Sequence, residues 1–258
     1  MIMKTKKIFT TAVFLIAFAT SGIAQNGLFE ARVDIGYGTT SGPQSVTNVS
    51  GSTSTDVPYS MGMGFNAALS ASYFFGDHIG AGLDINYVVG TPTTVTSGGT
   101  IQYTSTLQGS LATVTPFLVL SAHPGGINPY GRFGIVLGVP QATISTTAAG
   151  PLAPSGTNID EASGNLAIGL YGAFGVEFPL SGNLALDVEL FDRSLQWEPG
   201  QVENTQAYDG ESKAKTITYS HSVTSPSGDN QVSSYSTLYS PFSSFGIKVG
   251  LTMKFGQM

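Results

Sequence analysis

The stretch that decides the fold is residues 245–255, Phe-Gly-Ile-Lys-Val-Gly-Leu-Thr-Met-Lys-Phe. Every odd position from Phe245 to Phe255 is apolar, and every even position is Gly, Thr or Lys. Because alternate side chains of an extended chain point to opposite faces, this pattern predicts a strand with one apolar face and one polar face. The apolar face meets either a protein core or lipid, and the rest of the sequence favours lipid.

The same alternation recurs in earlier segments, which we interpret as strands because their apolar residues return at every second position. These segments span residues 28–37, 61–75, 79–89, 111–121, 129–139, 166–178 and 184–193. In the second segment the outward set begins with Met61 and Met63. In the fourth segment the even positions from Ala112 to Leu120 form the more apolar face, so we expect them to point outward.

Strand length and loop asymmetry favour a membrane barrel over a soluble sandwich. The alternating runs approach the roughly 9–11 residues that a tilted strand needs to cross a bilayer, whereas strands of globular proteins average about 5–6 residues. Connections after the second, fourth and sixth strands are short, and the others are long. Outer-membrane barrels sort their connections in this way, with short periplasmic turns and long extracellular loops. The sequence therefore predicts an all-β fold: a closed antiparallel up-and-down transmembrane β-barrel of eight strands with long extracellular loops.

The long connections are polar and rich in Ser, Thr and Gly. We expect loops at residues 39–58 and 140–163, and hairpins that project into water at about 93–103 and 216–239. The last of these alternates weakly on both sides of Gly228-Asp229-Asn230, so a barrel of ten strands stays open.

Charged residues of the predicted strands fall on the polar face, opposite the apolar one. A charge that faces lipid at the bilayer midplane costs about 2–4 kcal/mol, whereas charges inside a barrel can pair. We therefore predict a structural charge network in the barrel interior, and no charge on the outward faces within the span. Its members are Glu30, Arg32, Asp34, Asp84, Arg132, Glu177, Asp187, Glu189, Arg193, Lys248 and Lys254.

Aromatic residues gather near both ends of the predicted strands, where two belts are expected at the levels of the lipid headgroups. The belt at the short-turn end would contain Phe29, Tyr73, Phe75, Phe178 and Phe255, and the belt at the long-loop end Tyr37, Tyr87, Trp197 and Phe242.

The first residues read as a cleaved signal peptide, with basic Lys4, Lys6 and Lys7 before a short apolar run and Gly22-Ile23-Ala24 at the end. We expect cleavage after Ala24, with residues 1–24 as the signal peptide and 25–258 as the barrel domain. Of 10 Lys and Arg, three lie in this segment, which leaves seven against 16 acidic residues. Nucleic acid is therefore not an expected partner, because phosphate binding needs clustered basic residues. The absence of cysteine excludes thiolate metal sites and disulfides.

The chain resembles the small outer-membrane β-barrel proteins, of the type represented by the OmpA membrane domain and OmpX. The resemblance covers the mature chain and rests on strand alternation, on loop order and on the final stretch Gly246-Ile247-Lys248-Val249-Gly250-Leu251-Thr252-Met253-Lys254-Phe255. It implies a location in the bacterial outer membrane, contact with outer-membrane lipid, and a final strand that the barrel assembly machinery reads. In that family an aromatic residue commonly ends the chain, whereas here Gly256-Gln257-Met258 follow.

These patterns favour a non-enzymatic barrel, structural or surface-binding, with a side-chain-filled interior and outer loops that could bind an extracellular ligand. The alternative is a small-ion channel through the interior. We expect no cofactor and no metal centre, because the acidic loop residues lack the spacing of a calcium loop. The loop charges are Asp56, Asp160, Glu161, Glu198, Glu203, Asp209, Glu211 and Asp229, against Lys213 and Lys215.

Two other function classes are less well supported by the sequence. A barrel enzyme that acts on surface lipid would need a nucleophile and a base in hydrogen-bond reach, and His221 beside Ser220 and Ser222 is the one candidate. The other histidines, His78 and His123, lie in predicted short turns. A soluble lipocalin-like barrel would put the apolar face inside, which the charges on the opposite face argue against.

Overall fold

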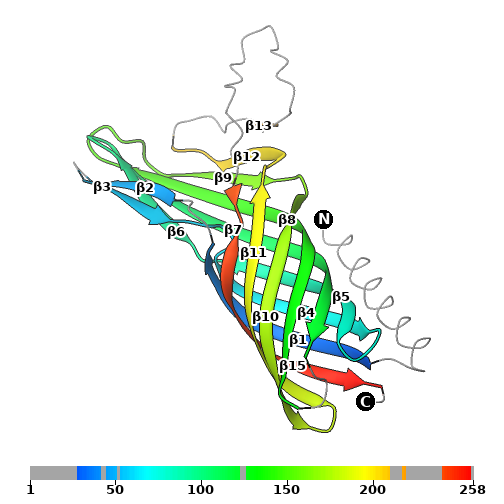
Figure 1. Cartoon of the computed structure of the whole chain (residues 1–258). Coiled ribbons are helices and arrows are strands. Elements are labelled where there is room, and N and C mark those ends of the chain that lie inside the picture. Colours follow the sequence, from blue (N-terminus) through cyan, green and yellow to red (C-terminus); the bar gives the residue numbers. More distant parts are fainter. Residues whose placement is uncertain are drawn as a thin grey trace.

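The structure is a computed structural model that describes residues 28–41, 45–50, 53–122, 126–209, 217–218 and 240–256. The predicted signal peptide lies outside these residues. Eight antiparallel strands form a closed ring in sequence order (Figure 1). They are β1 (Leu28–Thr40), β4 (Gly64–Phe74), β5 (Ile79–Gly90), β7 (Gln102–Ser121), β8 (Asn128–Ala149), β10 (Ala167–Ser181), β11 (Leu184–Trp197) and β15 (Ser244–Phe255).

The ring closes where the stretch that decides the fold, β15, meets the first strand. β15 pairs with β1 from Phe29↔Phe255 to Thr40↔Ser244, and on its other edge it pairs with β11. The remaining neighbours are consecutive in the chain, and β7 pairs with β8 to complete the circle. No ring strand is left with a free edge of unpaired backbone groups. The predicted closed up-and-down barrel of eight strands is thereby confirmed.

Side chains alternate between the outside and the inside of the ring, as the sequence predicts. Large apolar side chains stand exposed on the outer surface; Phe65, for example, is 70% exposed. In β7 the even positions from Ala112 to Leu120 point outward and the odd ones inward, which confirms the predicted orientation of this strand. The outer wall is therefore apolar, and the inner wall carries the charges.

The two ends of the barrel differ. At one end, hereafter the short-turn end, β4–β5 and β10–β11 are joined by residues 75–78 and 182–183, and Gly182 has the positive φ (49°) of a tight turn. At the other end, the long-loop end, the predicted loops contain strands. These are β2 (Ser45–Ser50), β3 (Thr53–Pro58), β6 (Thr93–Gly98), β9 (Thr157–Ser163), β12 (Gln201–Gln206), β13 (Ile217–Thr218) and β14 (Ser240–Pro241).

The expectation of a plain loop at residues 140–163 is therefore wrong. β7 and β8 continue together beyond the ring, and β8 then pairs with β9 and β9 with β12. The result is a projecting sheet in the order β6-β7-β8-β9-β12, which stands above the ring in Figure 1. The sequence of the extension is rich in Thr and Ser, which are compatible with a sheet that has water on both faces. The predicted loop at 39–58 is likewise wrong in part, because β2 and β3 form a hairpin there.

The hairpin predicted at 216–239 lies almost wholly outside the described residues. Its described part, β13, pairs with β12 in the projecting sheet and not with a ring strand. Among the described residues no helix is long and apolar enough to cross a membrane.

The aromatic belt at the short-turn end has the predicted outward orientation, with Phe29 against Phe255 and Tyr73 against Phe75. At the long-loop end, Tyr37 and Tyr87 also face outward. The assignment of Trp197 to this belt is wrong, because its side chain is 1% exposed and lies inside the barrel. Phe242 was also assigned to this belt, and Met61 was predicted to face outward. Both side chains are buried inside the barrel instead.

Two polar residues also depart from the expected orientation. Asn165 has the parity of the inward residues Tyr171 and Glu177 and would face inward in a longer strand, but it is exposed in the turn before β10 and has a positive φ of 51°. Asp192 points outward near the long-loop end of β11, where it accepts a hydrogen bond from Oγ of Ser41. The outward face is thus free of charge only away from this rim.

Candidate functional site in the barrel interior

The inner wall carries all of the charged side chains that the structure buries among its described residues. Each of the eleven residues predicted to face the interior is at most 9% exposed. Six are acidic and five are basic, so their formal charges nearly cancel. Period-two alternation places them there, because each occupies an inward position of its strand. Whether this network has a purely structural role stays a prediction.

Glu189 on β11 is the acid on which most of the network converges. Its carboxylate accepts hydrogen bonds from the hydroxyls of Tyr171 (2.5 Å) and Tyr130 (3.1 Å). Three cations surround it: Nη1 of Arg32 and Nε of Arg132 at 3.5 Å, and Nζ of Lys248 at 3.8 Å. The strands that supply these groups are β1, β8, β10 and β15 together with β11, so this acid ties opposite walls of the barrel together.

A second group of ion pairs lies nearer the short-turn end. Arg32 bridges Glu177 (2.8 Å) and Asp187 (3.4 Å), which are direct cross-strand neighbours on β10 and β11. Lys254 bridges Glu177 (2.7 Å) and Glu30 (3.3 Å). The basic side chains thus separate acids that would otherwise repel one another, which buried charges require.

Three of the eleven charges have no oppositely charged residue within bridging distance among the described residues. Asp34 and Asp84 are acids of β1 and β5, and neither oxygen of Asp34 has a hydrogen-bond partner there. Arg193 donates instead to the hydroxyl of Ser244 (2.8 Å) and to the carbonyl of Gly62 (3.4 Å). Buried polar groups without a protein partner are ordinarily satisfied by water or by a change of protonation state.

Above the charges, towards the long-loop end, the interior is filled by apolar side chains that we call the mouth plug. The rings of Trp197 and Phe242 lie 5.7 Å apart in an edge-to-face arrangement, and Nε1 of Trp197 donates to the carbonyl of Gly164 (2.8 Å). The mouth plug consists of Tyr59, Met61, Val88, Leu111, Val136, Phe191, Leu195, Trp197 and Phe242.

Two connecting segments supply part of the mouth plug by folding into the ring. The amide of Met61 donates to the carbonyl of Pro241 (2.8 Å), and Oγ of Ser60 donates to the carbonyl of Ser243 (2.6 Å). Gly62 permits this approach, because a Cβ at this position would clash with the backbone of Phe242. The hydroxyl of Tyr59 is buried here without a partner, and burial raises the pKa of this phenol, so it stays neutral.

A smaller apolar cluster fills the interior at the short-turn end. It contains Phe74, Phe117, Val119 and Tyr130. The guanidinium groups of Arg32 and Arg132 lie 4.4 and 5.3 Å from the centre of the Tyr130 ring, so this ring forms cation–π contacts with two bases of the charge network.

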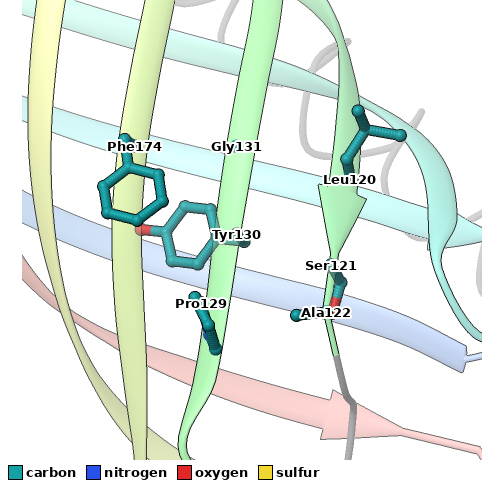
Figure 2. A pocket seen from close by; sticks show the side chains of 7 residues that line it. All are labelled: Leu120, Ser121, Ala122, Pro129, Tyr130, Gly131 and Phe174. Atoms are coloured by element: carbon teal, nitrogen blue, oxygen red, sulfur yellow. The ribbon is translucent and has the colours of Figure 1, made fainter.

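The wall itself carries two shallow apolar hollows. One, of about 300 Å³, lies where Gly131 of β8 pairs with Leu120 on one side and Phe174 on the other, and the absent side chain leaves the space (Figure 2). The other, of about 560 Å³, lies over Ala67, between Tyr87 and Ile35. Neither hollow is lined by a charged residue.

Little else in the described residues indicates chemistry. His78 lies in the turn after β4, where Nδ1 is 3.0 Å from the carbonyl oxygen of Ser121. The other histidines, His123 and His221, lie outside the described residues, as do Glu211, Lys213, Lys215 and Asp229. No group of three or more His, Asp or Glu residues in the described ranges is placed to hold a metal ion. Asp160 forms hydrogen bonds with the side-chain amides of Asn158 and Asn204.

Sequence reasoning missed the mouth plug, although a pattern for it was present. Trp197, Leu195 and Phe191 share the parity of Asp187 and Glu189 on β11, so strict alternation places them inside. The aromatic character of Trp197 suggested the outer belt instead. Continuing the parity of the charged residues along the strand would have found them.

Comparisons with known proteins add little to this description. No protein-family model matches the chain, and no curated protein matches it. Among solved structures the chain is similar to Neisserial surface protein A, with 16% sequence identity, a TM-score of 0.37, and coverage of 89% of this chain and 100% of that chain. The fold assignment rests on the strand pairings of the chain itself.

Proposed function

We propose that this protein is an integral barrel of the bacterial outer membrane that does not conduct ions and presents a polar sheet at the cell surface. The observation that carries the proposal is the division between the two faces of the ring. Large apolar side chains are exposed outside, while all eleven interior charges are buried. In water this outer surface would be a very large exposed apolar patch, whereas in a bilayer it meets lipid tails.

The difference between the two ends gives the orientation. Short turns face the periplasm in outer-membrane barrels, and long loops face outward. The projecting sheet of β6, β7, β8, β9 and β12 then stands on the extracellular side, where its polar surface can contact an extracellular ligand or the headgroups of neighbouring lipids. Residues 1–24 serve as a cleaved signal peptide and 25–258 as the barrel domain, and β15 as the strand that the assembly machinery reads.

The packed interior supports a structural or surface-binding role over the alternative of a small-ion channel. The mouth plug closes the interior at the long-loop end, and the smaller cluster packs at the short-turn end beside the ion pairs of Lys254. An ion would have to displace Trp197 or Phe242 from a packed apolar layer in order to reach the charges, and each is at most 1% exposed. No constellation for catalysis is assembled in the described residues, so we propose a non-enzymatic protein.

The test is reconstitution of the refolded protein into planar bilayers and vesicles. We expect added protease to cut only the projecting sheet and to leave a protected barrel fragment, and we expect no channel openings in bilayers with confirmed insertion. The Lys254→Gln variant is a matched control, because it removes a charge near the short-turn end without touching the mouth plug. Openings whose ion preference changes in Lys254→Gln would establish a channel instead, and a protein that stays soluble without detergent or lipid would exclude the membrane barrel.

A further inference from the structure

A single cross-strand row of the inner wall holds three carboxyl groups. Asp34 of β1 pairs with Gly250 of β15, Gly250 pairs with Asp187 of β11, and Asp187 pairs with Glu177 of β10. All three acids point inward and are at most 2% exposed. Like charges directly opposite each other on neighbouring strands are destabilising, so this row needs compensation.

Gly250 allows two of these acids to meet. It has no side chain, and a Cβ at this position would clash with Oδ1 of Asp34. The carboxyl group of Asp34 therefore leans over Gly250, whose partner on its other side is Asp187 of β11. Two carboxyl groups from strands that are not neighbours thus face each other across Gly250 inside the barrel.

The donors around this contact do not suffice for two carboxylates. Oδ2 of Asp187 accepts from the hydroxyl of Thr252 (3.0 Å), and Oδ1 has Arg32 at 3.4 Å. Both oxygens of Asp34 lack any hydrogen-bond donor among the described residues. Ionised carboxylates only accept hydrogen bonds, so a stable contact between them requires that one carries a proton.

The charges that face this pair do not remove the need for a proton. Arg32 from β1 and Arg132 from β8 are the cations that face Asp34, and Asp187 is the acid opposite it. Arg32 also forms salt bridges with Glu177 and Glu189, and Lys248 of β15 forms one with Glu189. The other acids that face the pair are Glu177 of β10, Glu189 of β11 and Asp84 of β5. Neighbouring β4 presents Asn66, Ala68 and Ser70, none of which is charged.

The total charge of the interior points the same way. Six acids and five bases are buried, which leaves a formal charge of −1 inside the barrel. One bound proton makes the interior neutral, and burial in a medium of low dielectric constant favours neutrality.

We propose that Asp34 and Asp187 share one proton at neutral pH and form an acid–carboxylate pair inside the barrel. The proton lies between an oxygen of Asp34 and an oxygen of Asp187, where it replaces repulsion by a charge-assisted hydrogen bond. The proton is shared, so it belongs to both residues. It is a proton-binding site on the inner wall of the barrel.

The proposal has a consequence for stability with a definite sign. Asp residues of the unfolded chain are ionised at neutral pH, since their ordinary pKa is about 3.9. The folded protein then binds one more proton than the unfolded chain, so its stability falls as the pH rises through the titration of the pair. Above that range the two buried carboxylates repel each other.

Infrared spectroscopy of the refolded protein with ¹³C-labelled aspartate tests the proposal. We expect a band from a protonated aspartic acid at neutral pH that disappears on alkaline titration. The band should be absent in Asp34→Asn, whose amide donates to Asp187 as the shared proton does. Glu30→Gln is the matched control, because Glu30 is a buried acid of the same strand that pairs with Lys254, and it should keep the band.

A second measurement guards against misfolded variants. The urea midpoint of the wild type should fall from neutral to alkaline pH, and that of Asp34→Asn should change less. Should Asp34→Asn fail to refold, Asp187→Asn replaces it, and the same loss of the band is expected. A wild type without a protonated-aspartate band at neutral pH would overturn the proposal, and so would a band that survives in the folded Asn variant.

Discussion

At the scale of single residues, Glu189 decides how the interior charges balance. It receives two tyrosine hydroxyls and lies within 3.8 Å of three cations that come from different strands. A buried cation that loses its acid retains the full desolvation penalty, so removing the shared partner affects all three at once. The network is therefore most sensitive at its single acidic centre rather than at any of the bases.

We predict that Glu189→Gln destabilises the refolded barrel by about 3 kcal/mol or more, because it leaves buried cations without a counter-charge. Glu30→Gln should cost less, since Glu30 has one bridging partner, Lys254, whose side chain is more exposed than the others of the network. Urea unfolding in detergent, followed by far-ultraviolet circular dichroism, measures both. Equal losses in the two variants would show that the position of Glu189 at the centre of the network has no energetic weight.

At the scale of elements, β7 and β8 each serve two structures. Their portions from Ser110 to Ser121 and from Asn128 to Gly138 pair within the ring, and their other portions lead into the projecting sheet. The ring pairings of β7 with β5 end at Val89↔Ser110, so nothing beyond this point is needed to close the circle.

We therefore predict that the β6–β7 hairpin can be shortened without loss of the barrel. Thr93 and Leu107 are cross-strand partners, so replacing residues 94–106 with Asn-Gly joins them through a tight two-residue turn. The variant should refold with the ring intact, as judged by a protease-protected fragment of the same ring strands. As a control, replacing residues 59–63 with Gly and Ser removes part of the mouth plug and should lower stability. Failure of the shortened hairpin to fold, with the control unaffected, would contradict this division.

Much of the ring could be predicted from sequence because period-two alternation is a local property. The parity of β15 alone places Lys248 and Lys254 inside, and the same logic placed the other charges of the network. The mouth plug could not be predicted in this way, because Met61 and Phe242 reach the interior through backbone contacts between segments far apart in the chain. Nor could the pairing of Asp34 with Asp187, which depends on Gly250 being aligned with both.

At the scale of the whole molecule, the interior is layered along the barrel axis. The mouth plug fills the long-loop end, and the smaller apolar cluster shares the short-turn end with the ion pairs of Glu30, Glu177 and Lys254. The ion pairs are held against buried apolar side chains, where the low local dielectric strengthens them and makes any unpaired charge costly. The arrangement explains why a barrel with eleven buried charges need not be a pore.

This layering makes a prediction for Trp197, the single tryptophan of the chain. A tryptophan in an outer belt would contact lipid, whereas the structure places this side chain inside the mouth plug with 1% of its surface exposed. Its fluorescence in vesicles should therefore resist quenching by brominated lipids and by aqueous acrylamide alike. Unfolding in urea should then expose it to acrylamide.

The matched control moves the tryptophan to the outer surface. In the variant Trp197→Phe with Tyr87→Trp, the new indole occupies an outward position of β5 that is 53% exposed in the protein alone. Brominated lipids should quench it strongly, because bromine atoms in the acyl chains contact the wall. Strong lipid quenching of wild-type Trp197 would mean that the end of β11 turns its odd positions outward. The barrel would then lack its mouth plug, and the interior charges would be open to the long-loop end.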